Sequence, residues 1–391
     1  MQTSLSPNKR IDVADVLRAV AVGAIFLLHS IEHFNFYRFP DPNCELLRFF
    51  DTTIWDSMFF IFAGKSYAIF ALLFGFSFFI QNDNQKKKGK KFGWRFVWRL
   101  LLLLMWGNLN AAFFTAEVLV LYALLGVTLL GVNPFKSKTV LIIAVICMLQ
   151  PYEWYKVIYA AMNPDFVPSE ALSSIYFANA YKVLPDGTFW QTMKMNLYDG
   201  QIASLTWAWD NGRFFQTASL FMLGLLAGRH KIFYDTESNT RLHIKIIIIA
   251  MICFFPLHGL RSVIPSFVEN KAMLTPLLLI VKSLSSFAFM LVLVSGITLI
   301  FYKTSYQKLL LKLAPFGKMS LSNYIMQSMI GSMLYYGWGF GLYQYLGITY
   351  SFILGIVLLY LQYRFSIWWM ASHRYGPLEG IWHKLTWIGK K

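Results

Sequence analysis

The sequence is poor in charged residues, and acidic residues are the scarcest of them. Only 14% of its 391 residues are charged, and 19 acidic residues stand against 35 basic ones. A typical soluble domain has about 25% charged residues, and a single hydrophobic core stops growing near about 250–300 residues. With 57% hydrophobic residues, the composition excludes an ordinary soluble enzyme. It also excludes a disordered chain, because disordered chains are poor in aromatic and branched side chains.

Cysteine is nearly absent as well. Cys44, Cys147 and Cys253 form no CxxC pair, so their spacing offers neither a disulfide framework nor a cysteine metal site, and we expect no metal cofactor. The net charge of +16 would favour a nucleic-acid partner only if the basic residues shared a soluble face. Here they stand between long apolar runs, so we expect no nucleic-acid partner.

The chain contains ten apolar stretches of the length needed to cross a bilayer. They are residues 13–34, 56–80, 95–114, 116–132, 139–161, 213–229, 245–264, 273–302, 318–338 and 348–370. This pattern predicts an all-α polytopic membrane bundle of about ten transmembrane helices, forming one domain over residues 1–391. No small-residue cleavage site follows the first stretch, which therefore reads as an uncleaved span.

Basic residues are distributed unevenly between the connections. If the N-terminus is inside, the inner segments hold 23 Lys and Arg residues and the outer segments hold 5. The positive-inside rule therefore predicts that both termini of this multi-pass membrane protein are cytoplasmic.

The longest connection, 162–212, is expected to be an extracytoplasmic loop with helices of its own. Ser169 is expected to cap a helix through Tyr181, and Thr188 with Gln191 forms a capping box for a second. Three tryptophans suit helices lying at the membrane interface: Trp190, Trp207 and Trp209.

Ionisable residues within a span are functional candidates, because each costs about 2.5–3.5 kcal/mol to insert. Arg18 and His29 are 11 residues apart, about three helical turns, so they share one face of the first span. Asp15 is placed to pair with Arg18. The alternatives are a snorkelling anchor for Arg18 and a neutral, hydrogen-bonded side chain for His29.

Residues 29–33 read His-Ser-Ile-Glu-His, which matches the H-x-x-E-H zinc pattern. A zinc site would use His29 and His33 as ligands, Glu32 as the base, and a third ligand such as Glu117. An intramembrane zinc hydrolase is therefore one hypothesis for the function.

Two further polar groups leave alternatives open. Asn108, Asn110 and Glu117 lie at the turn between the third and fourth spans, either as a solvated turn or as a cluster at the depth of His29.

The ninth span carries a polar stripe that serves either helix packing or a cavity. Its members are Ser320, Asn323, Gln327 and Ser328.

The tail after His373 contains Arg374, His383 and Lys384. These residues could meet a phosphate-bearing ligand, or they could belong to an amphipathic interfacial helix that starts after Pro377.

Several of these segments resemble the YeiB-like family of bacterial membrane proteins. The resembling segments are DVLRAVAVGAIFLL, FAGKSYAIFALLFGFSF, RLLLLLMWGNLNAAFFTAEVLVLYALLG, GKMSLSNYIMQS and RYGPLEGIWHKLT. They occur in order along nearly the whole chain. The resemblance implies a distant relation to membrane acyltransferases, which include the glycan O-acetyltransferases and the lysosomal heparan-glucosaminide N-acetyltransferase.

This sequence departs from the family pattern at two positions. His29 stands where the family usually has Asn, and Asn110 stands where it often has His in a third-span G-x-x-H pattern. The Arg18-x(10)-His29 spacing is similar to the first-helix motif of the glycan O-acetyltransferases. That similarity carries over to Arg18 and His29 alone.

The leading hypothesis is a membrane acyltransferase that moves an acyl group, expected to be acetyl, from acyl-CoA to a sugar or lipid acceptor. His29 would act as base or acyl carrier, Glu117 would orient it, and Asn110 would donate to the reacting carbonyl. The residues expected to bind the CoA phosphates are Arg18, Arg99 and Arg374. The residues expected to line the substrate cavity are Glu32, His33, Asn108, Asn323 and Gln327.

The second hypothesis is a transporter or exporter of a small amphipathic molecule, since ten spans with scattered polar residues fit that class too. Membrane lipids are the expected surroundings in either case, and the sequence is compatible with a homodimer.

Overall fold

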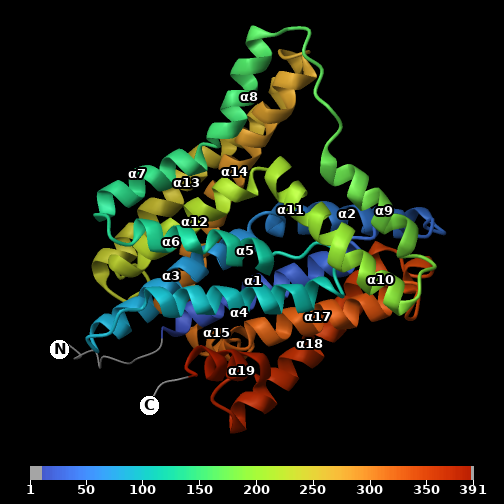
Figure 1. The fold of residues 1–391 in the computed structure, drawn as a ribbon. Helices are drawn as coiled ribbons and strands as arrows, with labels where there is room; N and C mark the ends of the chain where they lie inside the picture. Colours follow the sequence, from blue (N-terminus) through green and yellow to red (C-terminus); the bar gives the residue numbers. More distant parts are fainter. Residues whose placement is uncertain (1–10, 389–391) are drawn as a thin grey trace.

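The computed structural model describes residues 11–388, and this part of the chain contains helices and no strand (Figure 1). The predicted all-α fold is confirmed. The helices are α1 Asp12–Ile31, α2 Glu45–Phe62, α3 Ser66–Lys86, α4 Gly93–Ala111, α5 Leu119–Leu125, α6 Val127–Val132, α7 Ser137–Met148, α8 Pro151–Met162, α9 Leu172–Val183, α10 Phe189–Met195, η1 Asn196–Gly200, α11 Gln201–Asp210, α12 Arg213–Arg229, α13 Glu237–Val263, η2 Ile264–Ser266, α14 Lys271–Lys303, α15 Gln307–Leu311, α16 Ala314–Lys318, α17 Ser320–Tyr335, η3 Leu342–Gln344, α18 Ile348–Ser372 and α19 Pro377–Thr386.

The architecture is that of a multi-pass membrane protein, but fewer helices than ten have the length and apolarity of a span. Among the described residues five such helices occur, and six if the bent pair α7 and α8 is one span. The other predicted spans are helical but shorter or less apolar, for example the 14 residues Leu119–Val132. The structure thus confirms several membrane-spanning helices and leaves the number ten as a proposal.

Three of the predicted continuous spans are interrupted. The 56–80 stretch is divided between α2 and α3 by a break at residues 63–65, where Gly64 has φ +76°. The 116–132 stretch is broken at Gly126. The 139–161 stretch bends by 45° at Gln150, whose φ of 60° is left-handed and ends α7 before Pro151 begins α8. Hydropathy alone does not reveal such breaks, since apolar residues continue through them.

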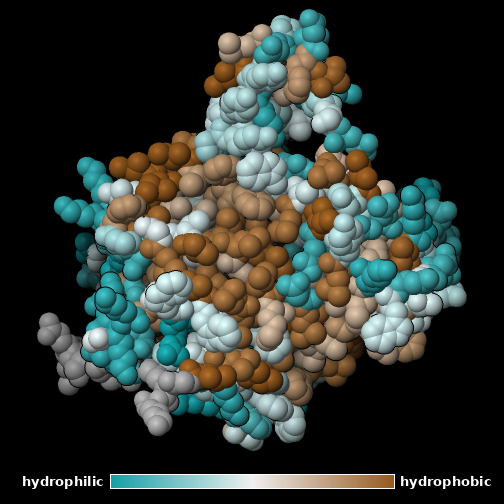
Figure 2. Space-filling view, in the orientation of Figure 1, coloured by the Kyte–Doolittle hydropathy of each residue, from teal (hydrophilic) through white to brown (hydrophobic). Residues whose placement is uncertain are grey.

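One end of the bundle gathers basic connections, and we call it the basic end (residues 86–93, 133–137, 229–237 and 373–388, left and lower left in Figure 1). Arg229 donates to the carbonyl oxygens of Asn133 at 2.7 Å and Phe135 at 2.9 Å. Lys303 pairs with Asp235 at 2.8 Å. Figure 2 shows a hydrophobic band between hydrophilic flanks at the left and right, as a bilayer requires.

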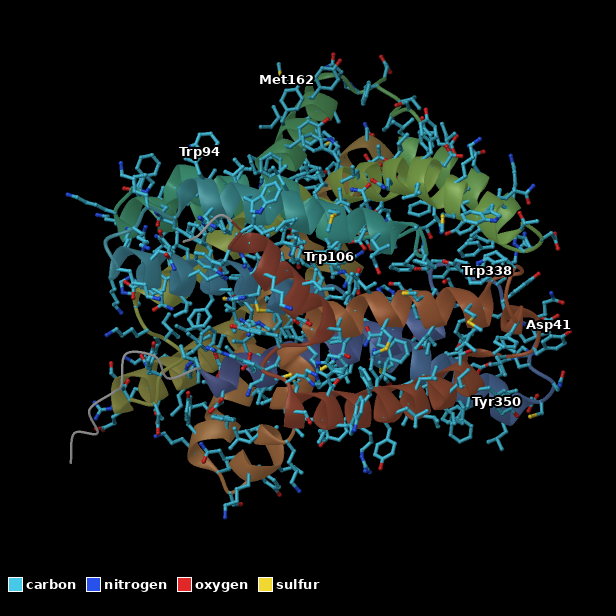
Figure 3. The ribbon with its side chains drawn as sticks, turned by 60° about the horizontal axis from the view of Figure 1, so that its bottom comes forward. Asp41, Trp94, Trp106, Met162, Trp338 and Tyr350 are labelled. Atoms are coloured by element: carbon cyan, nitrogen blue, oxygen red, sulfur yellow. The ribbon has the colours of Figure 1, made fainter. Side chains whose placement is uncertain are left out.

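The opposite end joins loops that are far apart in the sequence. The Tyr336 hydroxyl donates to the Phe34 carbonyl oxygen at 2.7 Å, and the Thr349 amide donates to the Asp51 carboxylate at 2.7 Å. Figure 3 shows Trp94 near one end of the molecule and Trp338 near the other.

The predicted loop 162–212 contains helices of its own, α9 to α11. The first begins at Leu172 without a side-chain cap, so the prediction that Ser169 caps it was wrong. The predicted capping box of Thr188 and Gln191 is confirmed at the start of α10. The three tryptophans are partly or largely exposed, as expected of residues at an interface: Trp190, Trp207 and Trp209.

A very close helix crossing joins α3 and α12. A Cβ added at Gly75 would overlap the Phe221 carbonyl oxygen, and one added at Gly224 would overlap the Leu72 carbonyl oxygen. Only glycine at these two positions lets the backbones approach this closely, which is how membrane helices gain packing energy. The crossing therefore fixes which face of α3 points away from α12.

We expect Gly75→Leu to destabilise the fold by about 1–3 kcal/mol or more, because the added side chain has no space at the crossing. Thermal unfolding of the purified protein in detergent measures this effect. Gly296→Ala is the control, because nothing lies within 4 Å of the position that its Cβ would occupy. Equal melting temperatures for the two variants would contradict the role assigned to the crossing.

Candidate functional site

A cavity of about 200 Å³ lies inside the helix bundle. Its walls come from α1, α3, α4, α5 and α17, with Trp382 of α19 at one side. Most of its lining is apolar or aromatic. The polar side chains that line it include Arg18, Tyr67, Ser77, Gln81, Arg99, Ser320 and Tyr324. A mostly apolar cavity with a few placed polar groups is the usual form of a small-molecule site.

Arg18 is held firmly in the wall of this cavity. Its Nη1 donates to Asp15 at 2.6 Å, as the sequence predicted, and its Nη2 donates to the Ser77 hydroxyl at 2.7 Å. Asp15 is only 1% exposed. A snorkelling anchor would extend toward water, whereas this guanidinium is fixed by two neighbours beside the cavity.

Arg99 lines the same cavity from α4 and is bound by the last helix. Its guanidinium carbon lies 4.3 Å from the centre of the Trp382 ring, and its Nη1 donates to the Thr386 hydroxyl at 3.2 Å. Arg95 donates to the Thr386 carbonyl oxygen at 2.8 Å. Two arginines from distant helices, Arg18 and Arg99, thus share one cavity.

Helix α19 is tied to the first turn of α17. The Glu379 carboxylate accepts hydrogen bonds from the backbone amides of Leu321 at 2.7 Å and Ser322 at 3.0 Å. These amides have no partner within their own helix, so the carboxylate caps α17 from another element. The predicted helix after Pro377 is confirmed, and it packs against the cavity wall instead of lying free at the interface.

Arg374 stands apart from the two cavity arginines. Its guanidinium lies 5.5 Å from the Tyr375 ring centre, and it is not among the residues that line the cavity. It does act on His383, which stacks on Tyr375 at 4.6 Å. Burial, then the charges of Arg99 and Arg374, lower the pKa of His383. The basic end therefore brings two arginines close to one imidazole.

His29 lies one turn beyond the cavity. Ile25 lines the cavity and stands four residues before His29, on the face of α1 that also carries Arg18. The His29 Nδ1 lies 3.0 Å from the Glu32 Oε2, and its ring centre is 4.7 Å from that of Phe114. The carboxylate that contacts His29 is therefore Glu32.

Both ring nitrogens of His33 make hydrogen bonds that join parts of the fold. Its Nδ1 lies 2.6 Å from the Arg38 carbonyl oxygen and its Nε2 lies 2.8 Å from the Ser351 hydroxyl. Helix α1 ends at Ile31, and His33 has φ 51°, so the helical spacing that a zinc pair needs is lost. Within residues 11–388 no group of three His, Cys, Asp or Glu side chains is placed to hold a metal.

Asn110 and Glu117 form a buried pair at the predicted turn. The Asn110 side-chain amide and the Leu119 backbone amide both donate to the Glu117 carboxylate. Asn110 and Glu117 are 0% and 3% exposed, so a solvated turn is excluded for them. Asn108 lies nearer the surface and accepts from the Gln201 amide at 2.8 Å.

The polar stripe of α17 divides between packing and the cavity. Asn323 donates to the Ser366 hydroxyl at 3.2 Å, and Gln327 donates to Gln362 at 2.7 Å. Both therefore join α17 to α18, as polar residues commonly do between membrane helices. Neither lines the cavity, nor do Glu32, His33 and Asn108, whereas Ser320 and Tyr324 of the same helix do.

Sequence reasoning missed the aromatic and hydroxyl side chains of the cavity. Tyr67, Phe70, Phe74 and Ser77 recur at helical spacing along one face of α3. That spacing was visible in the sequence, but in an apolar span it looks the same as ordinary core packing.

Comparison with known proteins supports the sequence resemblance. Residues 227–389 match the family described as "Protein of unknown function (DUF418)". The uncharacterized protein YxaH of Bacillus subtilis (strain 168) is 27% identical over 416 residues, covering 99% of this chain and 97% of its own length. An uncharacterized 39.9 kDa protein in the amylase 3' region of Bacillus acidopullulyticus is 24% identical, covering 98% of this chain and 95% of its own.

The uncharacterized protein YeiB of Escherichia coli (strain K12) is 33% identical over 79 residues, which is 20% of each chain. No solved structure matches. The protein is thus a multi-pass membrane protein with bacterial homologues. Its residues 227–389 match the DUF418 family, and the chain is a distant homologue of YxaH and YeiB, which confirms the YeiB-like resemblance.

We expect His383→Gln to reduce the acid sensitivity of the fold. The pKa of His383 is lowered in the folded protein, so the unfolded chain takes up its proton first as the pH falls below about 6.5. His383 therefore does not lower the free energy of unfolding above that pH, whereas below it the free energy of unfolding decreases. Melting temperatures measured between about pH 7.5 and pH 5.5 should fall less in the variant than in the wild type. An equal fall would contradict this assignment.

Proposed function

We propose that this protein is a membrane acyltransferase that moves an acyl group, expected to be acetyl, from acyl-CoA to a sugar or lipid acceptor. One observation carries the proposal. A single face of α1 holds Arg18 beside the cavity, Ile25 in its wall and His29 one turn beyond it. A guanidinium that can bind an anionic group and a candidate base thus share one helix face, with the base one turn beyond the apolar cavity.

The dimensions suit a long, flexible donor. Arg18 and His29 are separated by about 16 Å along the helix axis. In the proposal, Arg18 and Arg99 bind the phosphates of CoA, with Arg374 and His383 further out at the basic end. The pantetheine arm occupies the apolar cavity, and its thioester reaches His29.

The chemistry follows from the contact between His29 and Glu32. With Nδ1 donating to Glu32, Nε2 is free to accept a proton from the acceptor hydroxyl, and the carboxylate stabilises the imidazolium. The hydroxyl oxygen attacks the thioester carbonyl carbon, the carbon–sulfur bond breaks, and the departing thiolate takes the proton back. Glu32 thus takes the orienting role first assigned to Glu117, which belongs with Asn110 to the neighbouring buried pair.

The orientation in the membrane belongs to the same proposal. Ten spans with both termini cytoplasmic would place the basic end, and so CoA, on the cytoplasmic side of a bacterial inner membrane. The acceptor would come from the other side, where α9, α10 and η1 surround a hollow of about 670 Å³ lined by charged and amide side chains.

We expect His29→Gln to lower the kcat of acetyl transfer from acetyl-CoA by about 10²–10⁴-fold, because a general base contributes a factor of this size. Glu32→Gln should lower kcat less, since it only orients the base. Purified protein in nanodiscs, assayed for thiol release with and without an acceptor mixture, measures the effect. The control is His230→Gln at the exposed end of α12.

Two results would contradict the proposal. One is an unchanged kcat in His29→Gln. The other is a wild-type protein that neither binds nor cleaves acetyl-CoA but moves an amphipathic solute across proteoliposomes, as a transporter would.

A further inference from the structure

Four positively charged side chains meet where α3 and α12 begin, away from the basic end at which both helices finish. They are Lys65, Arg213, Arg261 and Lys282, and we call them the four-cation cluster. The Lys65 ammonium lies 5.6 Å from the ring centre of Phe289 in α14, and Arg213 Nη2 lies 3.6 Å from the Cβ position of the adjacent Gly64. At this spacing the charges of Arg213, Arg261 and Lys282 reach Lys65, and those of Arg213 and Arg261 reach Lys282. The cluster therefore joins four elements: the α2–α3 break, α12, α13 and α14.

No carboxylate balances this cluster. Within residues 11–388, none of the four side chains forms an ion pair with an acidic residue. Lys65 is only 8% exposed, and its ammonium donates to the Phe60 carbonyl oxygen at 2.6 Å. Like charges near one another in a medium of low dielectric constant repel strongly, so this arrangement is costly unless an anion joins it.

The surroundings are built to receive that anion. The guanidinium carbon of Arg213 lies 3.9 Å from the ring centre of Tyr67 and 5.6 Å from that of Trp207. Its Nη1 donates to the Gln216 side-chain oxygen at 3.2 Å, and contact with a ring face leaves other N–H groups of arginine able to bind phosphate oxygens. The positive N-terminal ends of α3 and α12, of 21 and 17 residues, lie at the same place.

Gly64 lies beside the cluster at the break between α2 and α3. It has φ +76°, and an ideal Cβ built on it would lie 3.5 Å from the Ser286 hydroxyl and 3.6 Å from Arg213 Nη2. A hydroxyl and a guanidinium, both able to donate to an anion, therefore approach the backbone at Gly64 together.

We propose that the four-cation cluster is a binding site for a phosphate group, supplied either by the headgroup of an anionic lipid or by soluble phosphate. Lysine contributes a point charge and arginine contributes directed N–H donors, the combination found where proteins hold phosphates. The site lies at the far ends of α3 and α12 from the basic end. It does not depend on the proposed acyl transfer, because it uses neither Arg18 nor Arg99, although Tyr67, which contacts Arg213, also lines the cavity.

Lipid retention by the purified protein tests this site. Native mass spectrometry after exchange into mixed phosphatidylglycerol and phosphatidylcholine micelles should show phosphatidylglycerol bound to the wild type. The double variant Lys282→Gln/Arg261→Gln should bind it about tenfold more weakly, since two charged donors are lost. Both side chains are exposed, so the fold tolerates the changes. Lys271→Gln, an exposed lysine at the start of α14, is the matched control.

Titration calorimetry with inorganic phosphate separates the two sources. Phosphate affinity that falls about tenfold in the double variant assigns the site to a soluble phosphate group, whereas selective loss of phosphatidylglycerol assigns it to a headgroup. Equal retention of phosphatidylglycerol and equal phosphate affinity in wild type and double variant would overturn the proposal. Binding of acetyl-CoA should be the same in both proteins, which keeps this result separate from the test of acyl transfer.

Discussion

The close crossing of α3 and α12 is the constraint on which the cavity depends. Gly75 and Gly224 bring the two backbones together, so one face of α3 is occupied by this contact. The adjoining face lines the cavity: Ser77 bonds to Arg18 of α1, whereas Tyr67 and Phe74 line the cavity and also contact Arg213 and Phe221 of α12. Ser77 accepts a hydrogen bond from Arg18. The packing of α3 against α12 therefore also sets the position of the arginine that is proposed to bind phosphate.

The cavity is closed by parts of the chain that lie far apart in the sequence. Arg18 and Arg99 come from the first 100 residues of the chain, whereas Trp382 belongs to the last helix and packs against Arg99. The DUF418 match covers residues 227–389, so it includes the α17 and α19 walls but not the α1, α3 and α4 walls. The similarity to YxaH covers 99% of the chain, and it includes every wall.

Much of this fold could be predicted from the sequence, and the failures have physical causes. Hydropathy located the helices, and the spacing of Asp15 and Arg18 predicted their ion pair. The breaks at Gly64 and Gln150 were missed because apolar residues run through them. The partner of His29 was predicted to be Glu117, but the carboxylate in contact is that of Glu32, three residues further along the chain. Likewise, no local pattern could show that Asn323 and Gln327 face α18.

The central claim is that the apolar cavity receives acyl-CoA from the basic end and delivers its thioester to His29. An experimental structure with a thioether analogue of acetyl-CoA tests this claim most directly. The account predicts that the phosphates of the analogue lie against Arg18 and Arg99, with its acyl end within hydrogen-bonding distance of the His29 ring. An analogue bound elsewhere, or a cavity filled by a lipid chain at saturating analogue, would contradict it.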